Sequence, residues 1–108
     1  IYLTPDAPIG AGTSFWISKH TGCRRPANHP LESWRFSSND EIANAINRTY
    51  TDETILQPEH WDLVDRVGAV YNRLVIWDAQ LIHSASSYQG IAGEQPQNSR
   101  LVQLFFFD

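Results

Sequence analysis

The apolar positions of the chain predict a series of short β-strands, most of them near its two ends. Strands are expected at residues 1–3, 13–18, 73–77, 80–84 and 100–107. These stretches are rich in β-branched and aromatic residues, which favour extended backbone, and Gly, Pro, Asp and Asn residues between them favour turns. The last stretch is apolar on both faces apart from Gln103, so we expect it to be buried on both sides.

Between the second and third expected strands, the apolar spacing changes to that of a helix. Residues 38–41, SNDE, have the form of a capping box, in which a hydroxyl caps the first turn and a carboxylate follows three residues later. Apolar residues then recur at helical spacing: Ile42, Ala45, Ile46 and Tyr50. A second short helix is expected from Pro58, a residue favoured in first turns, to Val67, where Gly68 can end it. The pattern predicts antiparallel β-structure with a helical insertion.

Length, charge and cysteine content restrict the class of protein. A chain of 108 residues is expected to form a single domain, residues 1–108. Its net charge of −4 argues against a nucleic-acid or anionic-membrane partner, because such partners usually require a basic surface. No apolar stretch approaches the roughly 18 residues of a membrane span. Cys23 is the single cysteine, so no intrachain disulfide can form and a reducing, cytoplasmic location is expected.

The histidines are the first candidates for chemistry. His20 and His29 lie in a proline-rich stretch and are expected to be solvent-exposed loop residues. His60 and Asp62 form an H-x-D pair, which is half of the ligand set of non-haem Fe(II) oxygenases. On the helix expected there, residues two apart point about 200° from one another, so we do not expect this pair to share an ion.

His83 and Arg100 form a more promising pair. His83 ends an apolar run, and a strand that ends at His83 followed by a strand that opens with Arg100 would form an antiparallel hairpin with both side chains on one face. A guanidinium at the start of a buried strand requires a carboxylate partner. That partner is either the carboxylate of a bound ligand, held in a bidentate manner, or a distant Asp or Glu of the chain.

Four segments of the chain carry a family resemblance: "IYL", "GAGTSFW", "NRLVIWDAQLIHS" and "SRLVQLFFFD". In this order they resemble the C-terminal part of the Fe(II)/2-oxoglutarate-dependent dioxygenase superfamily, in particular its prolyl-hydroxylase-like branch. The first two are similar to the strands that follow the family's H-x-D motif. The third resembles the strand with the distal metal histidine, and the fourth resembles the closing strand whose arginine binds 2-oxoglutarate. Residues 20–65 match no motif of the family.

The resemblance implies a mainly β fold, a double-stranded β-helix (jelly roll), incomplete and with a short helical insertion. His83 would be the distal ligand of Fe(II). Arg100 would bind the far carboxylate of 2-oxoglutarate, and the phenol of Tyr2 would hydrogen-bond the same group. The reaction would be the oxidative decarboxylation of 2-oxoglutarate to succinate, coupled to hydroxylation of an unknown substrate, either a small molecule or a protein side chain.

The chain also departs from the family. The H-x-D motif would precede residue 1, so His83 supplies only one of the three protein ligands that such an iron needs. The chain opens on an expected strand without a methionine, and we therefore expect a fragment of a longer protein. The alternative is a metal-free jelly-roll binding or interaction module without catalysis. An incomplete jelly roll leaves strand edges unpaired, so we expect a homodimer through these edges.

Overall fold

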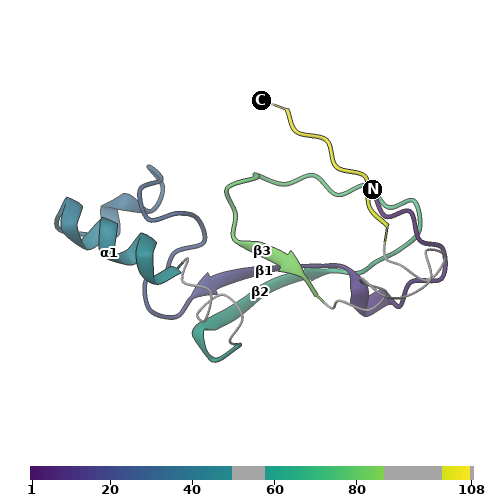
Figure 1. Cartoon of the computed structure of the whole chain (residues 1–108), viewed down its shortest axis with the longest axis horizontal. Helices are drawn as coiled ribbons and strands as arrows, with labels where there is room; N and C mark the ends of the chain where they lie inside the picture. The colour runs from purple at the N-terminus through teal and green to yellow at the C-terminus, as the bar shows by residue number, and fades with distance from the viewer. Residues whose placement is uncertain (50–57, 87–100, 108) are drawn as a thin grey trace. The chain divides into compact units, whose positions relative to one another are not determined.

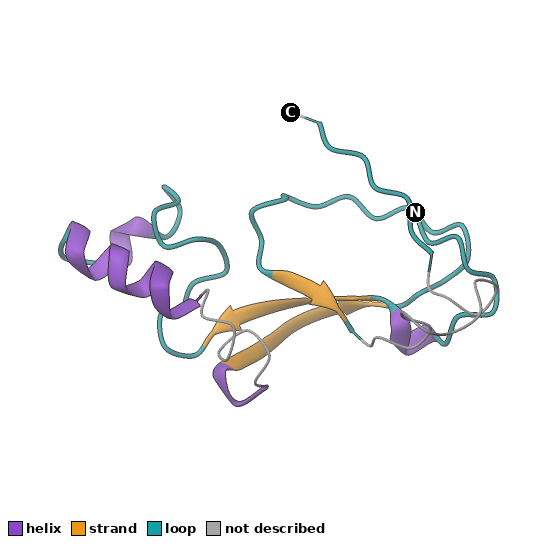
Figure 2. Ribbon diagram, in the orientation of Figure 1, coloured by secondary structure: helices purple, strands orange, loops and turns teal. Residues whose placement is uncertain are grey.

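The computed structural model describes residues 1–49, 58–86 and 101–107. Its strands are β1 (Thr13–Ser18), β2 (Trp61–Val67) and β3 (His83–Ala85), and its one α-helix among the described residues is α1 (Asn39–Thr49). The strands form a small antiparallel sheet in the order β2-β1-β3 (Figure 1). Short 3-10 helices occupy Ile9–Ala11, Ser33–Arg35 and Pro58–His60, and Figure 2 shows that loops and turns make up much of the remaining described chain. No helix among the described residues is long and apolar enough to cross a membrane.

The chain divides into two compact units, and each is described by itself. The first unit consists of Ile1–Ser14, Arg66–Trp77 and Ser84–Asp108, and the second consists of Phe15–Asp65 and Asp78–His83. Each unit has its own small group of buried apolar side chains.

Strand β1 confirms the expectation for residues 13–18. Its sequence, TSFWIS, combines β-branched and aromatic residues that fit a pleated surface. On one edge, the backbone N–H of Trp16 donates to the carbonyl of Ile82 (3.0 Å). At its C-terminal end, the N–H of Lys19 donates to the carbonyl of His60 (3.0 Å). These bonds set the register of β1 against both of its neighbours.

In the first unit, the N-terminal segment lies between two other segments of the chain. Tyr2 exchanges backbone hydrogen bonds of 2.7 and 3.1 Å with residues 72–73, while Ile1 and Leu3 exchange bonds of 2.9 Å with residues 101–103. Tyr2 and Val102 form an isolated antiparallel bridge. The buried hydrophobic side chains of this unit are Tyr2, Ala11 and Ala69, against which Ala7, Val67, Val75 and Val102 pack.

In the second unit, α1 packs its apolar stripe on the loop that follows β1. Ile42, Ala45 and Ile46 meet Cys23, Ala27 and Phe36. Ser38 caps the helix as predicted, because its Oγ accepts the N–H of Glu41 (3.2 Å). The expected stripe residue Tyr50 lies outside the described residues. Burial raises the pKa of the Cys23 thiol.

A buried carboxylate organises the same loop. The side chain of Glu32 is 2% exposed and meets Nε of Arg35 at 2.9 Å and a terminal guanidinium nitrogen of Arg25 at 3.7 Å. It also accepts the backbone N–H of Arg24 (3.2 Å). Arg25 in turn pairs with Asp78 through Nε at 3.1 Å. Because a buried charge is costly unless it is paired, these contacts explain how Glu32 can be buried here.

The helix expected over residues 58–67 is wrong. The structure has a 3-10 turn at Pro58–His60 followed by strand β2. The WDLVDRV sequence of β2 fits two periods. Trp61 and Val64 are three residues apart, as on a helix, whereas Trp61, Leu63 and Val67 all lie on odd positions, as on one face of a strand. Backbone pairing with β1 selects the strand, and such long-range pairing overrides weak local helix propensity.

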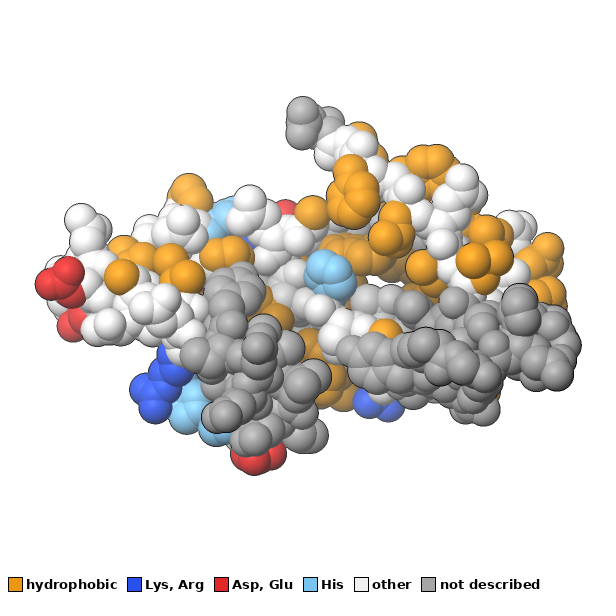
Figure 3. Space-filling model, in the orientation of Figure 1, with side chains coloured by type: hydrophobic (Ala, Val, Ile, Leu, Met, Phe, Trp, Pro, Cys, Tyr) orange, Lys and Arg blue, Asp and Glu red, His pale blue; other side chains and the backbone are white. Residues whose placement is uncertain are grey.

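Four strand expectations also need correction. Residues 1–3 form only an isolated bridge at Tyr2 and no strand. Residues 73–77 form no strand, and the strand expected at residues 80–84 is β3, His83–Ala85. Within residues 101–107, the described part of the last expected strand, only Val102 is bridged. This part is not buried on both sides, because Leu101 and residues 104–107 are 58–83% exposed. Hydrophobic side chains stand at the surface near this end (Figure 3). The segment that pairs with residues 101–103, residues 1–3, is too short to form backbone hydrogen bonds with residues 104–107 as well.

Gly12 permits the close approach of β1 and β2. A Cβ atom there would overlap the backbone carbonyl oxygen of Val67, whereas a Cβ at Gly10 would meet nothing within 4 Å. We therefore expect Gly12→Ala to lower the free energy of unfolding by about 1–3 kcal/mol, because one strand must shift. Gly10→Ala, the matched control, should change it by less than about 1 kcal/mol. Chemical denaturation followed by circular dichroism measures both, and equal stabilities of the two variants would contradict the close approach.

Candidate functional site

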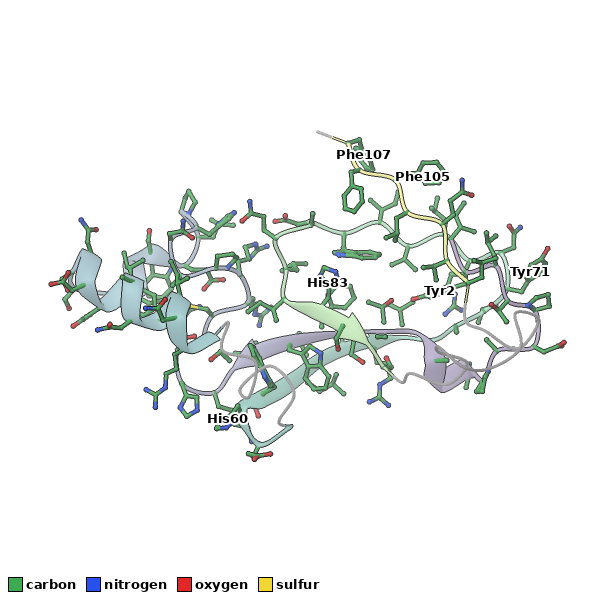
Figure 4. The ribbon with its side chains drawn as sticks, in the orientation of Figure 1. Tyr2, His60, Tyr71, His83, Phe105 and Phe107 are labelled. Carbon is green, nitrogen blue, oxygen red and sulfur yellow. The ribbon has the colours of Figure 1, made fainter. Side chains whose placement is uncertain are left out.

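His83 stands at the first position of β3 and is exposed (Figure 4). Its Nδ1 lies 2.7 Å from the carbonyl oxygen of Leu81. A carbonyl can only accept, so Nδ1 carries the proton and donates it. Its ring also lies near that of Phe15, with 6.2 Å between centroids and a tilt of 45°.

This hydrogen bond sets the tautomer of His83. With the proton on Nδ1, the neutral ring presents the lone pair of Nε2. Histidines that bind metals in proteins usually donate their other ring N–H in this manner, often to a backbone carbonyl. The role of His83 as a metal ligand, which the resemblance implies, stays a prediction.

Tyr2 places a phenol inside the first unit. The residue is 6% exposed, and its hydroxyl shares a hydrogen bond of 2.6 Å with Oγ1 of the buried Thr13. The chain positions Tyr2 through its bridge to Val102 and positions Thr13 at the start of β1. Because one of the two hydroxyls donates to the other, the pair keeps one O–H that can donate to a carboxylate of a bound ligand.

A second pair of hydroxyls lies one residue further along β1. Oγ of Ser14 and Oγ of Ser86 share a hydrogen bond of 2.6 Å, and Ser14 is fully buried. The N–H of Ser86 donates to the carbonyl of Gly12 (2.9 Å), which holds this segment against β1. Every buried polar side-chain atom of the described residues has a hydrogen-bond partner.

The three residues that the sequence assigns to the site are described to different extents. Tyr2 belongs to the first unit and His83 to the second, so each is placed within its own surroundings. Arg100 lies outside the described residues. Residue 101 follows it directly and is described, and the N–H of Leu3 donates to the carbonyl of Leu101 (2.9 Å).

The H-x-D pair at residues 60–62 requires a correction. Asp62 lies on strand β2 and not on a helix, so the angular argument against the pair does not hold. Asp62 pairs with Lys19, with 3.8 Å between Oδ1 and Nζ. Nδ1 of His60 instead meets Nε2 of His20 at 2.8 Å. Within residues 1–49, 58–86 and 101–107, no three His, Cys, Asp or Glu side chains form a group that could hold a metal ion.

Sequence reasoning missed the contact between His20 and His60. His20 is exposed, as expected, but the centre of its ring lies 4.9 Å from that of His60, with an angle of 39° between the ring planes. The two residues are brought together because Lys19, next to His20, pairs with His60 through the backbone. Recognition of residues 61–67 as a strand antiparallel to β1 would have revealed this contact.

Besides Cys23, two further groups in the second unit have a shifted pKa. Slight burial, together with the charges of Arg48 and His60, lowers the pKa of His20. Hydrogen bonds from the backbone N–H of Gln80 and from Arg25 lower the pKa of Asp78. A lowered pKa favours the neutral form of His20 and the charged form of Asp78 at neutral pH.

Comparisons with known proteins give one finding. Neither the curated proteins nor the solved structures contain a match to this chain. The pattern of one protein family, described as a family of unknown function and named DUF6445, matches residues 1–107. The chain belongs to the DUF6445 family.

Proposed function

We propose that this chain is part of an Fe(II)/2-oxoglutarate-dependent oxygenase that hydroxylates a small molecule or a protein side chain. The proposal includes a jelly-roll fold, of which the small antiparallel sheet is one part. It rests on the order of the four segments that resemble the superfamily and on the backbone pairing of those segments.

The pairing of the four segments is the observation that carries the proposal. "GAGTSFW" contains the first four residues of β1, which pairs with the His83 strand β3 and with β2. "IYL" contains Tyr2, which is hydrogen-bonded to residues 72–73 and bridged to Val102. The first segment thus contacts the start of the third segment and the fourth, and the second segment contacts the end of the third. Pairing between segments that are distant in sequence supports a jelly roll, whose Greek-key connections join strands in this manner.

Each assigned residue would have a distinct role. Nε2 of His83 would bind iron, and the Nδ1 hydrogen bond to Leu81 would hold its ring in orientation. Arg100 would form a bidentate pair with the far carboxylate of 2-oxoglutarate. The phenol of Tyr2 would donate to the same carboxylate from its buried position and accept a hydrogen bond from the hydroxyl of Thr13. Iron and 2-oxoglutarate, when bound, supply the oxidation chemistry itself.

The proposal requires two further iron ligands from the encoded protein. We predict that the coding sequence places an H-x-D or H-x-E motif about 10–25 residues before Ile1, a distance set by typical strand and loop lengths. Sequencing of the gene upstream of this segment checks the prediction. A stop codon or an unrelated domain at that place would favour the metal-free binding module in its stead.

Loss of His83 should remove the metal. In the encoded protein with its upstream residues, we expect His83→Ala to abolish stoichiometric Fe(II) binding, because one of three protein ligands is lost. Anaerobic titration with Fe(II) measures the affinity. The matched control is His29→Ala, which removes another histidine and should leave Fe(II) binding in place. Unchanged Fe(II) affinity in His83→Ala would overturn the assignment.

Loss of Arg100 should affect 2-oxoglutarate alone. We expect Arg100→Ala to weaken 2-oxoglutarate binding at least about tenfold, the typical cost of losing a charge-assisted hydrogen-bonded pair, while Fe(II) still binds. Calorimetric titration of the Fe(II)-loaded protein with 2-oxoglutarate measures this change. Arg24→Ala, at an exposed arginine, is the control. Equal 2-oxoglutarate affinity in Arg100→Ala and the parent protein would contradict the role.

A further inference from the structure

The second unit contains a histidine pair that the proposed oxygenase chemistry does not use. His20 lies on the turn after β1. His60 lies directly before β2 (Figure 4). Forty residues separate them in sequence, yet Nε2 of His20 and Nδ1 of His60 are 2.8 Å apart. Both nitrogens therefore point towards the same small volume near the protein surface.

The backbone around both rings is well fixed. Lys19 donates its N–H to the carbonyl of His60 (3.0 Å), so the segments that carry the two rings are joined directly. The turn after β1 is closed because Gly22 donates its N–H to the carbonyl of Ser18 (2.8 Å). Gly22 adopts a φ of +74°, which a residue with a side chain rarely adopts. Two imidazoles held in this manner lose little freedom when they bind one ligand.

The distance between the nitrogens is close to that of a metal chelate. Zinc–nitrogen bonds are about 2.0–2.1 Å long, so two imidazole nitrogens on one ion stand about 2.9–3.4 Å apart for angles between square and tetrahedral. To bind one ion, the two nitrogens would have to move slightly further apart than the observed 2.8 Å, and each ring would have to rotate. His20 is exposed and His60 is half-buried, so at least the ring of His20 has space to turn.

The charge of the surroundings allows a cation. Metal binding requires the neutral form of both imidazoles. Lys19 nearby is paired with Asp62, so its charge is partly offset. Glu59 is exposed and adjoins His60 in the sequence. Arg48 is the remaining basic group that acts on His20.

We propose that His20 and His60 form a chelating site for one divalent transition-metal ion of the Zn²⁺, Ni²⁺ and Cu²⁺ class. The two imidazole nitrogens are the protein ligands, and water completes the coordination. Bound metal would replace the shared proton between the rings and link the end of β1 to the start of β2. Since the ion binds the folded chain, it would also raise the thermal stability of the chain.

Titration with Zn²⁺ tests this site. The chain is titrated in a calorimeter, and the thermal unfolding midpoint is followed with and without Zn²⁺. We expect saturable binding of one ion per chain and a higher midpoint. His20→Gln and His60→Gln retain a side chain that can hydrogen-bond, and each should lose at least about tenfold in affinity together with the shift of the midpoint.

Controls separate this site from the proposed iron site. His29→Gln and His83→Gln should keep the parent affinity for Zn²⁺. Parent affinity in either His20→Gln or His60→Gln would overturn the proposal, and so would the absence of saturable binding. Loss of Zn²⁺ binding in His83→Gln alone would assign the metal to the proposed iron site and also overturn it. Failure of the His20 and His60 site leaves the oxygenase assignment of His83 untouched.

Discussion

Pairing of β1 with a neighbour on each edge is the constraint on which the rest of the described structure depends. On one edge, Trp16 and Gly12, the residue before β1, are hydrogen-bonded to the residues that flank β3. On the other edge, Gly12 lets the backbone approach Val67 of β2 closely, because glycine has no Cβ atom. Several of the candidate residues take their places from this pairing. His83 opens β3, Thr13 opens β1, and the histidine pair stands where β1 ends and β2 begins.

The sequence predicted those elements whose signals are local. The bounds of β1 follow from its β-forming residues, and α1 follows from its capping hydroxyl and apolar stripe. The helix expected at residues 58–67 failed because its apolar spacing satisfies two periods, and only the partner strand decides between them. The last expected strand failed for a related reason. Its hydrophobicity predicts burial, but burial requires a covering surface that no local pattern reports.

At the candidate site, too, features with a local sequence signal were predictable and features that depend on distant partners were not. An apolar run that ends on His83 was visible in the sequence, whereas the hydrogen bond to Leu81 that sets its tautomer was not. The partnership of Tyr2 with Thr13 depends on a turn that joins two segments, and the contact of His20 with His60 depends on strand register. Hydroxyl pairs such as Tyr2 with Thr13 contribute little net stability over well-packed apolar side chains.

The single thiol of the chain, Cys23, can report local unfolding of the second unit. Cys23 is 1% exposed and sits among Ala27, Ala45 and the apolar stripe of α1. Its raised pKa and its burial both suppress reaction with alkylating reagents in the closed state. Alkylation therefore requires α1 to detach from its loop, and its rate reports the opening equilibrium of that helix. The native sequence thus carries an internal probe for local unfolding of the second unit, which needs no engineered label.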